Sequence, residues 1–370
     1  MPLPVSVLGS GGNGLSLDPR DSGARTNAAA AADATGKVTG AQLTRLGRIT
    51  GYQLDYSDPA AYAQGHGLIE LTTGVDVYHD AGAASRALTF WRQDDLLNRT
   101  YASSLMSVSV KWYSAGAVGG RSYALLFELA PAGAPPVYET DLAFTRGDLL
   151  GAVSLTGASG DGIEAEAAGL AQKLSARIRA ARAGRLRGRP VRVPPKPKAG
   201  PPARGPDPSK LVLRPADLGG GKVKKEGYTV GPERDALSTY DRQMTPAGSF
   251  PFLESEVSLF QSTDEARFIA AALGATFASP AAAKRELGPT IGGQRITGIH
   301  TETTPIGVPG ASAATLVTVT VADRAALVFE FVVLRDGAAV ELLSAVTTAT
   351  AASLTTLQTA TQKASDRLHG

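Results

Sequence analysis

The sequence contains no cysteine. This absence excludes disulfide bonds, thiolate metal sites and cysteine nucleophiles. Histidine is also scarce: there are four, and none stands in H-E-x-x-H or another spacing typical of metal ligands. We therefore expect no metal site and no cofactor.

Long apolar runs are absent as well. No stretch approaches the roughly 18 uninterrupted apolar residues that a membrane-spanning helix needs, so we predict no transmembrane segment. Residues 1–14 lack the basic region and apolar core of an export signal. If the protein acts in the cell envelope or is secreted, as we favour below, its leader is missing from this sequence. A cytoplasmic location is the alternative.

The positive charge of the chain is concentrated in one segment. The net charge is +3, yet residues 183–208 alone carry seven basic side chains and one acidic one. The flanking halves are each slightly acidic, so no specific nucleic-acid binding is indicated.

This basic segment reads AGRLRGRPVRVPPKPKAGPPARGPDP. Its prolines favour extended polyproline II geometry, which predicts a stiff linker. The alternative is that it also adheres to an anionic surface. The residues that would make this contact are Arg185, Arg187, Arg189, Arg192, Lys196, Lys198 and Arg204.

The two halves of the chain repeat one pattern. VDVYHDAGAASRALTFW in residues 75–91 corresponds to VSLFQSTDEARFIAAAL in residues 257–273. Each segment reads as a strand, a polar turn and an amphipathic helix. We predict two diverged copies of one domain, at 1–182 and 209–370, joined by the linker at 183–208.

The second copy shows its elements most clearly. A helix is predicted from Thr263, with Ser262 or Thr263 as its N-cap. Strands are expected at 294–301 and, as a meander of three, at 314–346, followed by a closing helix at about 350–368. Residues 211–221 suggest an opening strand or turn. The first copy follows the same order, so we predict an α+β fold: two tandem, mainly antiparallel sheets, each with two helices packed on one face.

Two nucleotide-binding patterns fail on their context. GSGGNG at residues 9–14 matches G-x-G-x-x-G, but Pro19 follows where the phosphate-binding helix should begin. Lys222 follows three glycines without the spacing of a P-loop. There is no G-x-S-x-G nucleophile elbow.

Aromatic residues are enriched in the first copy, which holds both tryptophans and eight of the ten tyrosines. Packing in the core and at strand edges accounts for such residues in most proteins. The alternative is a pocket lined by aromatic side chains for an apolar or sugar-like ligand. Its candidate residues are Tyr52, Tyr56, Trp112 and Tyr113.

The order strand, helix, meander, helix, opened by an L-x-x-x-D-L-G-like segment at Leu213 to Gly219, resembles the PsbP-like domains of small actinobacterial lipoproteins. It also resembles the extracytoplasmic sensor domains of some bacterial kinases. The resemblance implies an exported, non-enzymatic binding domain, often anchored to lipid.

Together these features favour a non-enzymatic, extracytoplasmic tandem binding or interaction protein. Its partner would be a small apolar or sugar-like ligand or another protein. The alternative is a hydrolase confined to the first copy, with the second copy degenerate. Carboxylates and a histidine of the first copy would then converge in a cleft, with Glu70, Asp76, His79 and Glu128 as candidates.

Overall fold

The structure is a computed structural model. It describes the chain except for residues 1, 5–6, 8–13, 33, 35–37, 59–60, 62–65, 103–105, 131–134, 187–190, 196–197, 230–235, 248–249, 288–289, 292–293, 322–323, 348–353 and 370. The chain forms two compact units. Unit 1 comprises Met1–Ser103, Ser107–Ala130 and Pro135–Pro197, and unit 2 comprises Ser104–Met106, Pro131–Ala134 and Lys198–Gly370.

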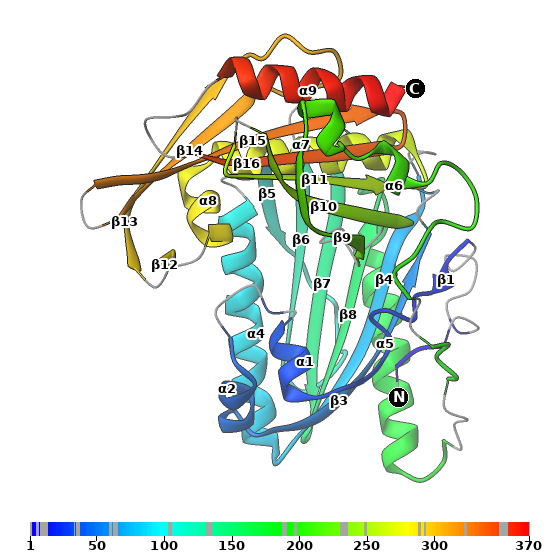
Figure 1. Ribbon diagram of the computed structural model, residues 1–370. Coiled ribbons are helices and arrows are strands. Elements are labelled where there is room, and N and C mark those ends of the chain that lie inside the picture. Colours follow the sequence, from blue (N-terminus) through cyan, green and yellow to red (C-terminus); the bar gives the residue numbers. More distant parts are fainter. Residues whose placement is uncertain are drawn as a thin grey trace. The chain divides into compact units, whose positions relative to one another are not determined.

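Unit 1 is built on one antiparallel sheet with the strand order β1-β3-β4-β8-β7-β6-β5, and β2 pairs with β3 outside this path (Figure 1). Its elements are β1 (Ser16–Leu17), β2 (Gly23–Arg25), α1 (Asn27–Ala32), α2 (Gly40–Arg45), β3 (Arg48–Ser57), β4 (Leu68–Tyr78), α4 (Ala81–Ala102), β5 (Ser107–Trp112), β6 (Ser122–Ala130), β7 (Val137–Arg146), β8 (Leu149–Gly157) and α5 (Ile163–Arg182).

Unit 2 has a second antiparallel sheet, with the order β12-β13-β14-β15-β16-β11-β10-β9. Its elements are α6 (Pro208–Leu211), η3 (Pro215–Leu218), β9 (Gly221–Thr229), β10 (Ser238–Pro246), β11 (Phe252–Leu259), α7 (Thr263–Ala278), α8 (Pro280–Leu287), β12 (Thr290–Ile291), β13 (Gln294–Thr304), β14 (Ala314–Val321), β15 (Arg324–Asp336), β16 (Ala339–Thr347) and α9 (Leu354–His369).

The predicted α+β class, with two mainly antiparallel sheets, is confirmed. The central path β3-β4-β8-β7-β6-β5 has the same order as β10-β11-β16-β15-β14-β13. A long helix follows the second strand of each path (α4 and α7), and another closes each unit (α5 and α9). The predicted meander corresponds to β14, β15 and β16. Residues 211–221, expected as a strand or turn, form mainly the helical turns α6 and η3 before β9 begins.

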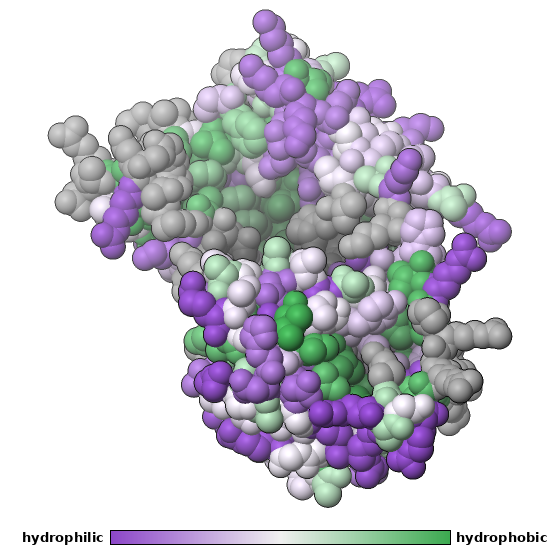
Figure 2. Space-filling model, turned by 90° about the horizontal axis from the view of Figure 1, so that it is seen from below, coloured by the Kyte–Doolittle hydropathy of each residue, from purple (hydrophilic) through white to green (hydrophobic). Residues whose placement is uncertain are grey.

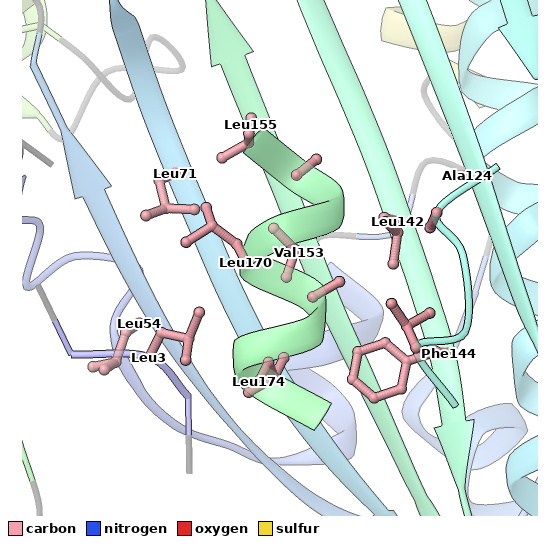
Figure 3. Close-up of a cluster of buried hydrophobic side chains, with 14 of the residues drawn as sticks. Leu3, Leu54, Leu71, Ala124, Leu142, Phe144, Val153, Leu155, Leu170 and Leu174 are labelled. Carbon is pink, nitrogen blue, oxygen red and sulfur yellow. The ribbon is translucent and has the colours of Figure 1, made fainter. Parts of the chain in front are cut away.

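The position of the helices corrects one detail of the sequence-based picture, because the two long helices of a unit do not share a face. In unit 1, α5 packs through Leu170 and Leu174 against Val153 and Leu155 (Figure 3). Helix α4 packs instead on Leu150 of the same strand. Side chains alternate between the faces of a strand, so residues 150 and 153 point to opposite sides. Strand β8 is therefore apolar on both faces, and a helix covers each one.

Unit 2 follows the same rule. Helix α9 packs on the side of Val332, and α7 packs on the side of the next residue, Val333. Helix α7 begins as predicted: the Ser262 Oγ accepts a hydrogen bond from the Glu265 N–H at 3.1 Å. This bond satisfies one of the free N–H groups of the first turn.

None of the described helices is both long and apolar enough to cross a bilayer. On the face shown in Figure 2, hydrophilic side chains are spread over the surface, with smaller hydrophobic areas between them.

Parts of the predicted linker pack against the units. Val191 and Val193 contact the core of unit 1, and the Tyr52 hydroxyl donates to the Val191 carbonyl at 3.4 Å. Further along, the Ser238 hydroxyl of unit 2 donates to the Gly200 carbonyl at 2.7 Å. Each end of the segment is thus tied to the unit next to it, which limits how freely the segment acts as a spacer.

Candidate functional site

Unit 1 contains a cavity of about 200 Å³ between the α4-covered face of its sheet and helices α1 and α4. The lining residues come from two helices, α1 and α4, and from six strands, β2, β3, β4, β6, β7 and β8. They are Arg25, Ala30, Arg48, Tyr52, Gln53, Thr72, Gly74, Asp76, Trp91, Asp95, Tyr123, Asp141, Leu142, Ala143, Leu150, Ala152, Val153 and Ser154. Polar and charged side chains contribute to this wall, although most of its surface is apolar.

One edge of the cavity is formed by a buried ion pair. The Arg48 side chain is 1% exposed, and its Nη2 donates to Asp76 Oδ1 at 2.7 Å. Its Nη1 donates to Asn27 Oδ1 at 2.8 Å, which ties the start of α1 to β3. The Arg48 Nε is buried and has no hydrogen-bond partner among the described residues. A buried polar atom without a partner is uncommon in folded proteins.

The opposite side carries two aspartates held by neutral hydroxyl groups. The Tyr123 hydroxyl donates to Asp95 Oδ2 at 2.6 Å, and the Ser154 hydroxyl donates to Asp141 Oδ1 at 2.8 Å. Burial, followed by the nearby Asp95 charge, raises the pKa of Tyr123 well above its usual range. Tyr123 therefore keeps its proton at neutral pH and remains a hydrogen-bond donor.

Two small residues make room for the cavity. Gly74 of β4 and Ala152 of β8 are cross-strand partners on the α4 side of the sheet. A Cβ placed on Gly74 would have the Tyr52 carbonyl oxygen, at 3.9 Å, as its nearest neighbour. The space above this pair is therefore open rather than filled by other side chains.

The corresponding place in unit 2 is almost closed. The backbone N–H of Tyr78 donates to the Asp148 carbonyl, and that of Phe260 donates to the Ala338 carbonyl, which aligns the two strand pairs. In this alignment the Gly74–Ala152 pair of unit 1 corresponds to the Glu256–Leu342 pair of unit 2.

Trp91 corresponds to Leu273 in the same alignment. The cavity bounded by Glu256, Leu342 and Leu273 is only about 20 Å³. Leu273 is smaller than Trp91, so the narrowing in unit 2 comes from Glu256 and Leu342, which replace Gly74 and Ala152.

The four aromatic residues predicted to bind a ligand are not brought together. Tyr52 borders the cavity, although its ring packs on the α5-side core. Tyr56 is buried in that core, where its hydroxyl donates to the Leu3 carbonyl. Tyr113 also packs there, with its hydroxyl 2.7 Å from Thr140 Oγ1, and burial raises the pKa of Tyr113 to about 12. Trp112, on the edge strand β5, is 53% exposed.

The predicted anionic-surface residues are partly described. Arg185, Arg192, Lys198 and Arg204 are exposed. Arg187, Arg189 and Lys196 lie outside the described residues, as does most of the glycine-rich segment at 9–14.

Of the residues named for a hydrolase, only Asp76 lines the cavity. His79 is exposed just after β4, and Glu128 on β6 accepts a hydrogen bond from the Ser109 hydroxyl at 3.4 Å. Glu70 is near the Thr72 hydroxyl, at 3.4 Å. No cluster of three or more His, Asp or Glu side chains among the described residues is placed to hold a metal ion.

Sequence reasoning missed most of the cavity wall, including Arg48, Gln53, Asp95, Tyr123 and Asp141. These five residues lie on four different elements, and no local motif links them. One signal was present: the aligned repeats place Gly74 and Ala152 opposite the bulky Glu256 and Leu342. Comparing residue volumes between the two copies would have indicated where unit 1 is hollow.

No protein-family model and no curated protein matches this chain. Among solved structures, the chain is similar to the extracellular domain of PknH from Mycobacterium tuberculosis, with a TM-score of 0.30 and 8% sequence identity. The match covers 47% of this chain and 92% of that domain.

Proposed function

We propose that this protein is a non-enzymatic tandem binding protein, in which unit 1 holds a small polar molecule in the cavity between α1, α4 and the sheet. One observation carries the proposal. The same position in the six-strand path that the two sheets share is open in unit 1, whereas Glu256 and Leu342 occupy it in unit 2. An ordinary core position would be expected to be filled in both copies, because protein interiors are close-packed.

The roles of the two units differ under this proposal. We infer that they are diverged copies of one domain, with boundaries near 1–182 and 209–370. Unit 2 would support the structure or contact a protein partner. The sequence resemblance to exported bacterial binding domains supports an extracytoplasmic location for the whole chain.

A hydrolase remains the second candidate, because the carboxylates of Asp76, Asp95 and Asp141 line the cavity. Binding is the better interpretation for Asp76, which is held in an ion pair with the buried Arg48. Hydrolysis of a glycosidic bond would require the other two carboxylates to act as a pair, one as acid and one as base or nucleophile.

The test is native mass spectrometry of the full chain purified from the cells that make it. The Gly74→Val variant places two methyl groups in the cavity, and Gly227→Val is the matched control. Gly227 is also a strand glycine with no atom within 4 Å of an added Cβ, but it lies on β9 of unit 2. We expect a discrete added mass on the wild type and the control, and its loss in Gly74→Val.

An added mass that persists unchanged in Gly74→Val would place the ligand elsewhere. A bare mass accompanied by co-purifying proteins would replace this proposal with a protein-interaction module. Recovery of a cleaved product, and loss of the cleavage in Asp95→Asn or Asp141→Asn, would favour the hydrolase.

The exposed basic residues of the linker support a second contact, with an anionic surface. Replacing Arg185, Arg192, Lys198 and Arg204 with Gln should weaken sedimentation of the chain with vesicles of phosphatidylglycerol, and more so at low salt. Neutral phosphatidylcholine vesicles are the control. Equal sedimentation of the wild type and the variant would remove this contact from the proposal.

A further inference from the structure

We propose that the unit 1 cavity takes a neutral polyhydroxylated ring, the chemistry of a single monosaccharide. This inference rests on the proposed function, since it names the class of molecule that the cavity binds. It depends on four properties of the wall: its mixture of donors and acceptors, its charge, its aromatic surface and its size.

The wall offers both donors and acceptors at fixed positions. Carboxylate oxygens of Asp76, Asp95 and Asp141 are acceptors. Gln53 receives a hydrogen bond from Arg25 on its Oε1, which leaves its Nε2 amide as a donor. A hydroxyl group donates and accepts at once, so a ring with several hydroxyls can use both kinds of partner.

The buried Arg48 also lines the cavity. Its Nη1 and Nη2 groups donate to Asn27 and Asp76, which fix the guanidinium in place. Arg48 therefore adds a positive charge at a fixed position in the wall.

The charge of the wall disfavours an ionic ligand. Two arginines and three aspartates line the cavity, so most of the charge is offset and one negative charge is in excess. A carboxylate or phosphate would compete with Asp76 for the Nη2 group of Arg48. An ammonium group would approach two guanidinium groups as well as the carboxylates. A neutral ligand avoids both conflicts.

Aromatic surface and size complete the argument. The Trp91 N–H donates to the Tyr78 hydroxyl at 3.4 Å, so the indole offers a ligand its apolar ring surface. The C–H face of a sugar ring packs well on such a surface. A cavity of about 200 Å³ is below the roughly 300–1,000 Å³ of sites for drug-sized ligands, which limits the occupant to about one ring.

The test uses Trp91 as its own reporter. The chain has two tryptophans, and Trp112 is 53% exposed on an edge strand outside the cavity, so Trp112→Phe leaves Trp91 as the single indole. The full-length Trp112→Phe protein is titrated with D-glucose, D-galactose, D-mannose and myo-inositol. Choline serves as the cationic probe and pyruvate as the anionic probe.

We expect at least one hexose or inositol to change the Trp91 emission with saturation, and choline and pyruvate to have no effect. Gly74→Val should abolish the response, and Gly227→Val should retain it. Gln53→Ala and Asp141→Asn should each weaken binding by about tenfold, the loss of roughly one good hydrogen bond. Thermal unfolding followed by circular dichroism checks that each variant is folded.

Other outcomes separate this inference from the proposed function. Saturation by choline or pyruvate alone, lost in Gly74→Val, overturns the sugar and keeps the binding site. The sugar is also overturned, and the binding site kept, if the native adduct does not have the mass of a sugar and no hexose or inositol changes the Trp91 emission. No adduct and no response to any probe would overturn both.

Discussion

The two units agree on one face of their sheets and differ on the other. On the side of α5 and α9, equivalent residues make equivalent contacts. The Leu3 N–H donates to the Thr73 hydroxyl at 3.1 Å, and the Leu213 N–H donates to the Ser255 hydroxyl at 2.9 Å. These bonds fix the opening segment of each unit over its sheet.

The closing helices agree in the same way. Ser175 of α5 donates to the Val118 carbonyl, and Ser365 of α9 donates to the Pro309 carbonyl. The buried positions 167, 170, 171, 174, 175 and 178 of α5 repeat at 357, 360, 361, 364, 365 and 368 of α9. Packing requirements on this face are therefore nearly the same in both units.

The side of α4 and α7 differs in size, charge and polarity. Unit 1 has the Arg48–Asp76 ion pair and an open cavity there. In unit 2, Asp76 is replaced by Ser258, and Glu256 and Leu342 stand where unit 1 has Gly74 and Ala152. The same fold forms with an open cavity in unit 1 and with a nearly closed one in unit 2. The fold therefore does not require the polar side chains of the unit 1 wall. The site that we propose for ligand binding lies where the two units differ.

A large loss of stability is expected when the ion pair between Arg48 and Asp76 of unit 1 is broken. Arg48→Met leaves Asp76 without its buried partner, which typically costs 3–5 kcal/mol. We expect a loss near the lower value, about 3 kcal/mol, because the Asp76 side chain is 20% exposed and keeps some hydration. Urea unfolding of the Trp112→Phe protein, followed by Trp91 emission, measures the stability of unit 1.

Asp76→Ser provides the matched control, because it introduces the residue that unit 2 has. The double variant Arg48→Met, Asp76→Ser should be more stable than Arg48→Met alone, since no unpaired charge remains. A loss below about 0.5 kcal/mol in Arg48→Met would mean that the pair does not distinguish the two units energetically.

Much of the secondary structure could be predicted from the sequence, because it depends on local patterns. Ser262 before a run of apolar residues at helical spacing gave the start of α7, and alternation around Gly337 gave the hairpin of β15 and β16. Helices on opposite faces were not predicted. Leu149 and Leu150 are both apolar, and such a strand is compatible with one buried face or with two.

The cavity could not be derived in this way, because it is a property of volume rather than of pattern. In the sequence, Asp95 and Asp141 cannot be distinguished from aspartates on the protein surface. Only the folding of α4 and β7 brings them to one wall of the cavity. The aromatic residues that seemed suited to a pocket are mostly used elsewhere: Tyr56 anchors the opening segment through Leu3. Aromatic content pointed to unit 1, where the cavity lies, without indicating the residues that line it.

One position on the α5 and α9 side of the sheets differs between the units and allows a further comparison. Gly151 of unit 1 lies under the ring of Phe144, and its counterpart in unit 2 is Glu341. Glu341 is fully buried and accepts a hydrogen bond from the Ser255 hydroxyl at 2.6 Å. Burial raises the pKa of Glu341 from 4.5 to about 8, so the folded protein keeps this carboxyl protonated at neutral pH.

This pKa shift makes unit 2 less stable as the pH rises. Between pH 4.5 and 8 the folded state holds a proton on Glu341 that the unfolded state releases. The stabilising contribution is therefore complete below pH 4.5 and declines up to pH 8, by at most about 1.4 kcal/mol per pH unit. Glu341→Gln keeps the size and the hydrogen bond but cannot ionise, so it should remove this slope.

Urea unfolding of the wild type and Glu341→Gln at pH 5, 6, 7 and 8 measures the effect. Burial also raises the pKa of Asp55 in unit 1 and of Asp241 in unit 2 to about 7, so these groups add slopes of the same sign. Both slopes are present in the wild type and in the variant, and only the difference between the two proteins isolates Glu341. If that difference does not change with pH, Glu341 is already ionised in the folded protein. A charge would then be present at the position where unit 1 has only glycine, and the match between the two faces would be weaker than the shared contacts indicate.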